Sequence, residues 1–362
     1  MKIIHCADLH LDAKMNTNLD IHKAKERQHE LIATFSRMIN YAVTNDVSAI
    51  IMAGDIFDSK MISATAKNAV ALAIFDNPEI TFYYMQGNHD TDTFLSGLEY
   101  IPENLKTFDY EWVSYRAGNI VVSGLELGIE NALIAADTLS LNEDDFNIVV
   151  LHGQESEHAA NDRAQTIALR NYQNKGIDYM ALGHVHAYKE EKLDARGVYC
   201  YSGCLEGRGF DECGEHGFVL LDIDEETKKC QRTFIPFASR TLYTVSVDVS
   251  GLMTSIQIVD RVRETLQESG YLPTSLIKVV LTGEVPMERE LNVSFISKQM
   301  EGMFYYLKIT DETQIAINYD EYELEQSLKG EFVRKVKESE LSEEEKRQII
   351  YYGMCLLTGK EI

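Results

Sequence analysis

Long hydrophobic runs are missing from this 362-residue sequence. Its longest apolar stretches have the length of a strand, so we expect no membrane-spanning helix and no membrane partner. The first residues, Met1–Cys6, read as a strand and lack the apolar core and small-residue cleavage site of a signal peptide. We therefore expect a cytoplasmic protein.

Positive charge is also scarce. Lys and Arg number 34 against 58 Asp and Glu, which gives a formal net charge of −24. This balance disfavours a protein that binds nucleic acid regardless of sequence through a broad basic surface. It does not exclude an enzyme whose positive charge comes from bound metal, because metal ions can dominate the local field. Solubility alone accounts for most of the acidity.

The six cysteines are scattered, and in a chain without export features we expect them to be reduced and buried. Cys200, Cys204, Cys213 and His216 lie close enough in the sequence to suggest zinc. However, their spacing is not that of a zinc knuckle, and Cys200 falls within the apolar run 198–201. A zinc site is therefore the less favoured interpretation.

The length exceeds what one hydrophobic core usually serves, so we expect more than one domain. Up to residue 85, strand patterns alternate with helix patterns, which is typical of a parallel sheet. The pattern then becomes mostly strands, which predicts two sheets packed face to face with helices outside. We expect a large domain over 1–239, a small α+β domain over 240–325 and a charged helical segment over 326–362.

Polar side chains follow five of the predicted strands at the point where each strand ends. One example is the loop Gly87-Asn88-His89-Asp90, which follows the apolar run 80–85. Open α/β sheets bind their ligands at this carboxyl edge. The residues concerned are Asp8, His10, Asp55, Asn88, His89, His152, His184 and His186.

Histidine, carboxylate and amide oxygen together suit Mn²⁺, Fe²⁺ or Zn²⁺ and not an all-oxygen magnesium or calcium cage. Seven strong ligands exceed the needs of one tetrahedral ion but suffice for two ions bridged by a carboxylate. Each histidine taken singly could be an ordinary structural residue. The recurrence of the pattern at five strand ends favours the metal interpretation.

The series Asp8-x-His10, Gly54-Asp55, Gly87-Asn88-His89-Asp90, His152 and Gly183-His184-x-His186 resembles the calcineurin-like metallophosphoesterases, motif for motif and in order. The resemblance implies a four-layer α/β/β/α sandwich that binds two divalent ions. It implies one ion on Asp8, His10, Asp55 and His186. It implies a second on Asn88, His152 and His184, with Asp55 shared between the two ions. His89 would stay free as a catalytic group that contacts the phosphate or protonates the leaving group.

Protein phosphatases of this superfamily carry Arg-Gly and Glu where this chain has Asp58-Ser59-Lys60 and Asp90. The segments 5–12 and 54–58 instead resemble the SbcD-type DNA repair exonucleases, and most closely their YhaO-like subgroup. This resemblance implies an Mn²⁺-dependent 3′→5′ exonuclease and single-strand endonuclease that acts on DNA. It also implies that 240–325 is a capping domain.

In that family the C-terminal helices dock on the coiled-coil base of an SbcC-like ATPase, and a homodimer is a further candidate assembly. From the residues alone, the apolar helix face near the C-terminus could cover its own domain equally well. Asp58, Arg208 and the polar loop Gln154–Gln165 border the predicted site and are candidates for substrate binding. Two other functions stay open: a phosphodiesterase or phosphatase for small nucleotides, and a non-catalytic subunit of an ATPase complex.

Overall fold

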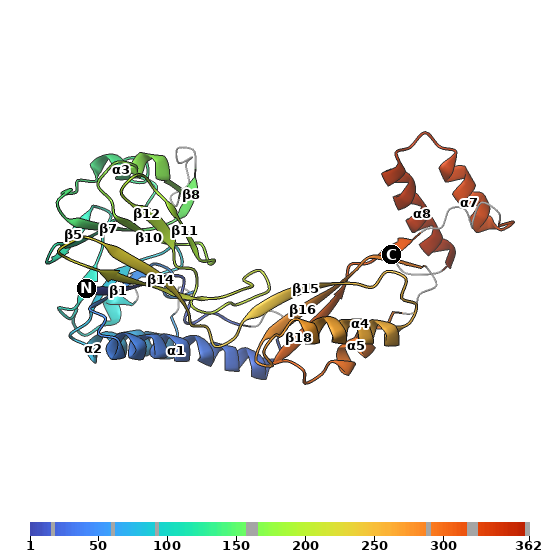
Figure 1. Ribbon diagram of the computed structural model, residues 1–362, viewed down its shortest axis with the longest axis horizontal. Coiled ribbons are helices and arrows are strands. Elements are labelled where there is room, and N and C mark those ends of the chain that lie inside the picture. The colour runs from blue at the N-terminus through green and yellow to red at the C-terminus, as the bar shows by residue number, and fades with distance from the viewer. Residues whose placement is uncertain are drawn as a thin grey trace. The chain divides into compact units, whose positions relative to one another are not determined.

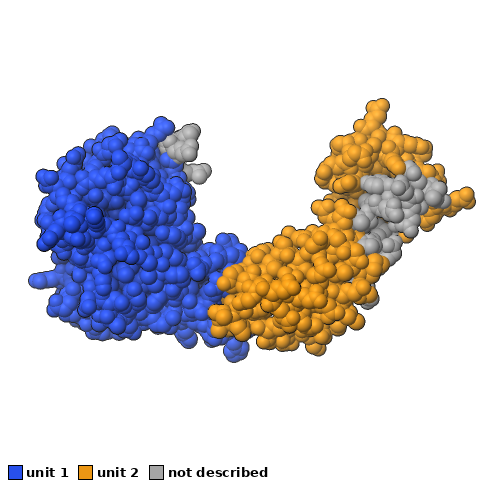
Figure 2. All heavy atoms as spheres, in the orientation of Figure 1, with its two compact units in different colours: residues 1–242 blue, residues 243–362 orange. Residues whose placement is uncertain are grey.

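The computed structural model describes residues 1–15, 19–58, 62–90, 94–156, 166–286, 291–316 and 325–358. The chain divides into two compact units, Met1–Leu242 and Tyr243–Ile362 (Figure 2). No helix in these described ranges is both long enough and apolar enough to cross a membrane.

Unit 1 contains two six-stranded mixed sheets (Figure 1). The first has the order β14-β13-β1-β2-β3-β4, in which β1 to β4 are parallel and β13 and β14 antiparallel. Its strands are β1 (Lys2–Cys6), β2 (Ala49–Ala53), β3 (Thr81–Met85), β4 (Leu105–Thr107), β13 (Gly217–Ile223) and β14 (Cys230–Pro236).

The second sheet has the order β11-β12-β10-β7-β6-β5. Its inner strands are parallel, and the edge strands β5 and β11 are antiparallel to their neighbours. Its strands are β5 (Val113–Ala117), β6 (Ile120–Gly124), β7 (Phe146–His152), β10 (Tyr179–Gly183), β11 (Lys189–Lys192) and β12 (Val198–Tyr201). The expected α/β fold with two sheets is confirmed, whereas β4 and β11 were not predicted because each is short and lacks an apolar run.

The two sheets share a buried core to which both contribute, for example Ile51 from β2 and Ile148 from β7. On the outer face of the first sheet lie α1 (Ile21–Thr44) and α2 (Ala64–Phe75) (Figure 1). The stripe Leu31, Phe35, Met38 and Ala42 of α1 is buried there, as its helical spacing predicted.

Short elements cover the outer face of the second sheet, namely α3 (Ala135–Thr138) and the 3₁₀ turn η2 (Leu169–Tyr172). A further 3₁₀ turn, η1, covers Leu95–Gly97. The segment predicted as the loop Gln154–Gln165 begins as a strand, β8 (Gln154–Ser156), which pairs with β9 (Thr166–Ala168). The rest of that predicted loop, 157–165, lies outside the described residues, as do Ser59 and Lys60.

Unit 2 contains a three-stranded sheet of order β15-β16-β18 over a separate apolar core. Its elements are β15 (Leu242–Asp248), α4 (Ser255–Glu268), β16 (Leu276–Thr282), β17 (Glu284–Pro286), α5 (Val293–Gln299), β18 (Tyr306–Asp311), β19 (Gln314–Ala316), α7 (Leu328–Lys337) and α8 (Glu343–Thr358). Its division into a capping domain (240–325) and a helical segment (326–362) stays a prediction.

The last helix, α8, begins with the capping box that its sequence predicted. The Ser342 N–H donates to Glu345 Oε2 at 2.9 Å, and the Glu345 N–H donates to Ser342 Oγ at 3.3 Å. Part of the apolar face of α8, including Ile350 and Met354, is buried with residues of α7. Leu356 on the same helix is 69% exposed. The face is therefore covered in part by its own unit.

We expect one core residue to make unit 1 sensitive to acid. His5 in β1 is fully buried between the sheets, with Nδ1 2.8 Å from the Tyr179 hydroxyl. Burial lowers the pKa of His5 from 6.5 to about 3, so between these values only the unfolded chain binds the proton. We expect the free energy of unfolding to fall by about 1.4 kcal/mol between pH 7.5 and 5.5 because of this group.

Urea unfolding of the metal-free protein at these two pH values measures the effect. The variant His5→Asn should lose this part of the pH dependence. The exposed His29 of α1 provides the control, since His29→Asn should retain the wild-type pH dependence. Equal pH dependence in wild type and His5→Asn would contradict the prediction.

Candidate metal centre

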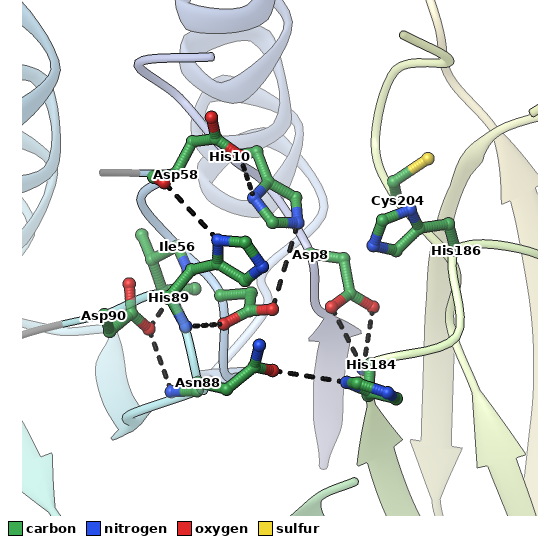
Figure 3. Close-up of polar contacts among 12 residues, drawn as sticks. Asp8, His10, Ile56, Asp58, Asn88, His89, Asp90, His184, His186 and Cys204 are labelled. Carbon is green, nitrogen blue, oxygen red and sulfur yellow. Dashed lines mark hydrogen bonds and ion pairs between the residues drawn. The ribbon is translucent and has the colours of Figure 1, made fainter. Parts of the chain in front are cut away.

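The loops that follow β1 and β2 are joined by backbone hydrogen bonds. The Asp8 N–H donates to the Gly54 carbonyl at 3.0 Å, and the His10 N–H donates to the Asp55 carbonyl at 3.1 Å. From the second sheet, the His184 N–H lies 3.0 Å from both carboxylate oxygens of Asp8. The carboxyl ends of strands from both sheets therefore meet at one place (Figure 3).

Asp90 joins the loops after β2 and β3. Its carboxylate accepts hydrogen bonds from the N–H groups of Ile56 at 3.2 Å, Phe57 at 2.9 Å and Gly87 at 3.0 Å. It is buried, and it holds the Gly-Asp turn against the loop that carries Asn88. Asp90 thus joins the two loops through hydrogen bonds from their backbone N–H groups. In the sequence it stood out only as the last residue of the Gly87-Asn88-His89-Asp90 motif.

Two glycines of these motifs allow the loops to approach one another closely. A Cβ at Gly87 would lie 2.2 Å from Asp55 Oδ1, and a Cβ at Gly183 would lie 2.0 Å from the Ala53 carbonyl oxygen. Any side chain at either position would push the strand ends apart.

Four of the predicted ligands adopt positive φ, a conformation that non-glycine residues rarely adopt. The angles are 51° for Asp8, 43° for His10, 53° for Asp55 and 102° for His184. Such conformations cost about 1–3 kcal/mol each and persist only where the surrounding structure enforces them. Their concentration at one place indicates a functional constraint.

The side chains form two sets of three, and within each set one ligand atom per residue lies within 4.8 Å of the others. The first set contains Asp8, His10 and His186, and the second contains Asp55, His152 and His184. A third group of this kind, His10, Asp58 and His89, overlaps the first set.

Asp55 lies between the two sets. Its Oδ2 is 3.3 Å from His152 Nε2 and 3.9 Å from His10 Nε2, so one carboxylate oxygen faces both. Asn88 completes the second set, since its Oδ1 is 3.0 Å from His152 Nε2 and 3.2 Å from His184 Nδ1. The structure thus brings together all seven predicted metal ligands.

These residues fit divalent cations. Asp8, His10 and Asp55 are each at most 2% exposed, and neither buried ring nitrogen of His10 has a hydrogen-bond partner among the described residues. A buried polar atom without a partner needs an explanation, which a bound ion would supply. His152 donates its Nδ1–H to the Ala53 carbonyl at 2.9 Å, as metal-binding histidines do to leave Nε2 for the ion.

The charged groups at the site shift one another's pKa values. Burial by itself raises the pKa of Asp55, but the hydrogen bond and charge of His152 outweigh burial and bring this pKa to about 2. Burial lowers the pKa of His152, but Asp55 and Asp8 raise it to about 9. Without metal, His152 therefore keeps a proton at neutral pH where an ion would bind.

An ion that binds the second set must displace this proton, so metal affinity should depend on pH. Because the pKa of His152 is about 9, we expect the affinity of that set for Mn²⁺ to rise about tenfold from pH 7 to pH 8. Equilibrium dialysis of the metal-free protein at the two pH values measures this. An affinity that does not change with pH would contradict the prediction.

His89 lies beside the two sets. Its backbone N–H donates to Asp55 Oδ1 at 2.8 Å, while its exposed ring lies 5.2 Å from the ring of His10. Its Nδ1 is 3.4 Å from the Asp58 carbonyl oxygen. The imidazole predicted to act in catalysis is thus accessible at the edge of the centre.

Arg208 and Asp58 contact the centre from its outer side. Arg208 Nη2 lies 2.9 Å from both Glu212 Oε1 and His186 Nδ1, and Nη1 lies 3.3 Å from Asp58 Oδ1. Sequence reasoning missed Glu212, because nothing in its local pattern points to the centre. Burial by itself raises the pKa of Glu212, but hydrogen bonds from His186 and Arg208 outweigh burial and bring this pKa below its ordinary value.

The alternative zinc site is not formed. Cys204 Sγ lies 3.2 Å from His216 Nδ1, but Cys200 is buried between the two sheets and Cys213 is exposed. No metal-binding group of three in the described part of the chain includes any of these residues.

Comparison with known proteins agrees with this geometry. The family model for calcineurin-like phosphoesterases matches residues 1–188. The DNA double-strand break repair protein Mre11 of Aeropyrum pernix is 25% identical over 341 residues, which cover 85% of this chain and 80% of that protein. The uncharacterised metallophosphoesterase YhaO of Bacillus subtilis is 28% identical over 309 residues, with 79% and 72% covered.

A second Mre11, from Saccharolobus solfataricus, is 23% identical over 345 residues and covers 90% of this chain and 86% of its own. The chain is therefore distantly homologous to the Mre11 and SbcD nucleases and to YhaO. With its motifs assembled into two His/Asp sets around Asp55, this chain belongs to the calcineurin-like phosphoesterase family.

Proposed function

We propose that the protein is a metal-dependent DNA nuclease of the SbcD type, a 3′→5′ exonuclease and single-strand endonuclease that acts in DNA repair. The meeting of the two His/Asp sets at Asp55 is the observation that supports the chemistry. The similarity to Mre11 supports the substrate. The similarity covers 85% of the chain, whereas unit 1 ends at Leu242. The similarity therefore extends into unit 2.

Two divalent ions would bind the two sets, Mn²⁺ in the first place and Fe²⁺ or Zn²⁺ as alternatives. Asp8, His10 and His186 would hold one, Asn88, His152 and His184 the other, and Asp55 both. When bound, such a pair supplies Lewis-acid charge to the phosphate and activates water for attack on phosphorus.

The chain's own residues set the geometry for that attack. Asp55 fixes the separation of the two sets, and the N–H of His89 in turn holds Asp55 Oδ1. The His89 ring, exposed at the edge of the centre, can contact the phosphate or donate a proton to the leaving oxygen.

The acidic surface has a consequence for DNA binding. A chain with net charge −24 repels the DNA backbone, so the bound cations would supply the attraction at the site. Residues 240–325 would act as a capping domain. The exposed part of the α8 face, with Leu356, would bind the coiled coil of an SbcC-like ATPase. A homodimer is a further candidate.

Three substrates separate the candidate functions: linear duplex DNA, single-stranded DNA and a chromogenic phosphodiester. Each is assayed with Mn²⁺, with and without an SbcC-like ATPase. We expect cleavage of both DNA forms. Cleavage of the chromogenic ester alone, even with the ATPase present, would overturn the nuclease in favour of a phosphodiesterase for small nucleotides. No hydrolysis of any substrate would favour a non-catalytic subunit.

A further inference from the structure

The two histidines of the first set are each backed by a carboxylate. His10 Nδ1 lies 3.1 Å from Asp58 Oδ1, and His186 Nδ1 lies 2.7 Å from Glu212 Oε1. The hydrogen bond at His186 Nδ1 leaves Nε2 of that ring available to an ion, and His10 Nδ1 faces Asp58 in an ion-pair contact without hydrogen-bond alignment. Carboxylates in this position fix the orientation of a metal-binding imidazole and strengthen it as a donor.

Arg208 ties these two carboxylates together. Its Nη1 donates to Asp58 Oδ1 at 3.3 Å, its Nη2 donates to Glu212 Oε1 at 2.9 Å, and its backbone N–H donates to Glu212 Oε2 at 2.8 Å. A planar guanidinium can hold two carboxylates in fixed directions, which the flexible ammonium of a lysine cannot. We call Asp58, Arg208 and Glu212 the brace.

The chain segment that carries two members of the brace, Arg208 and Glu212, is itself anchored to α1. Arg27 of α1, which is 1% exposed, donates to the Gly207 carbonyl at 2.8 Å and to Glu206 Oε2 at 3.1 Å. Thr34 Oγ1 of the same helix donates to Glu206 Oε1 at 2.6 Å. Buried, satisfied polar networks of this kind are rigid, so the brace rests on a fixed support.

The second set is held by weaker partners. His152 Nδ1–H donates to the backbone carbonyl of Ala53, which is neutral. The ring of His184 faces Asn88 Oδ1, which belongs to the same set. A neutral carbonyl strengthens an imidazole less than a carboxylate does. The two sets are therefore unequal although both contain histidine and aspartate.

We propose that the brace makes the site of Asp8, His10, Asp55 and His186 the tighter of the two metal sites. Mn²⁺ fills it first, and the second site fills only at higher concentration. This inference rests on the proposed two-metal function. It makes Asp58 and Arg208 positioning residues, in place of the substrate-binding role expected from the sequence.

The test is a titration of the metal-free full-length protein with Mn²⁺, followed by equilibrium dialysis and by electron paramagnetic resonance. For the wild type we expect two binding steps, the first with the signal of an isolated ion and the second with that of a coupled pair. Glu212→Gln should weaken the first step by about 10- to 100-fold and leave the second within about threefold. Asp58→Asn removes the carboxylate beside His10 and should likewise weaken the first binding step selectively.

Asp145→Asn is the matched control. Asp145 forms a bidentate ion pair with Arg116. It lies just before β7, at the opposite end of that strand from His152, so its replacement should change neither binding step. Equal affinity of the two wild-type sites, or equal weakening of both steps in Glu212→Gln and Asp58→Asn, would overturn the brace proposal and leave the two-metal centre intact. A wild type that binds no Mn²⁺ would instead overturn the proposed function.

Discussion

Replacement of Asp55 by asparagine should abolish hydrolysis and reduce the bound metal from two ions to at most one. Asp55 Oδ2 is the atom that faces both His10 and His152, so the substitution removes the one negative charge that both ions would share. We expect the rate of phosphodiester hydrolysis to fall by about 10³-fold or more. Metal analysis after dialysis against Mn²⁺ and a chromogenic ester assay measure the two effects.

The side chain of Asp55 is 2% exposed, so folding needs its own check. An asparagine oxygen can still accept the His89 N–H, so we expect the metal-free variant to keep most of its thermal stability. The control is Asp178→Asn, which removes a carboxylate paired with Arg196 at the start of β10, away from the centre. A variant that keeps both ions and full activity would refute the shared carboxylate.

Replacement of His89 by glutamine should have the opposite pattern, with the metal retained and turnover lost. The ring of His89 is exposed beside the two sets, so its removal takes no ligand from either. We expect turnover of DNA to fall by about 10²-fold or more. If His89 protonates the leaving oxygen, a nitrophenyl ester should lose less, because its leaving group needs no proton.

Measurement of the two substrates side by side, with metal content for each preparation, gives both results. His22→Gln on α1 changes another exposed histidine and should leave turnover unchanged. Unchanged turnover in His89→Gln, or loss of metal from it, would show that the assigned role is wrong. In particular, metal loss would favour the overlapping group of His10, Asp58 and His89 as a ligand set.

The local sequence pattern was sufficient to predict those features of the fold that depend on residues close together in the chain. The stripe of α1 and the capping box of α8 involve residues three or four apart, so their geometry follows from helical spacing. The predicted metal ligands were found in the same way, because each follows a strand-length apolar run directly. The short strand β11 was missed, because its four residues are all charged and show no apolar pattern.

Asp58 and Arg208 were predicted to border the centre, but their contacts and the part of Glu212 could not be predicted, because these contacts join residues far apart in the chain. Arg208 and Glu212 lie on a segment whose sequence reads as an ordinary polar turn. Arg27, about 180 residues earlier, anchors that segment, and no local pattern links the two. Asp90 looked like a motif residue, and only the fold shows that it holds two loops together through their N–H groups.

By itself, the sequence determined which residues stand at the strand ends and that their chemistry suits a pair of divalent cations. This follows because strand period and ligand type are both local properties. The tertiary structure decided which strand ends meet, that Asp55 lies between the two sets, and that Asp58, Glu212 and Arg208 lie behind the histidines of the first set. Those facts depend on the packing of two sheets, which brings together side chains as far apart in the sequence as Asp8 and His186.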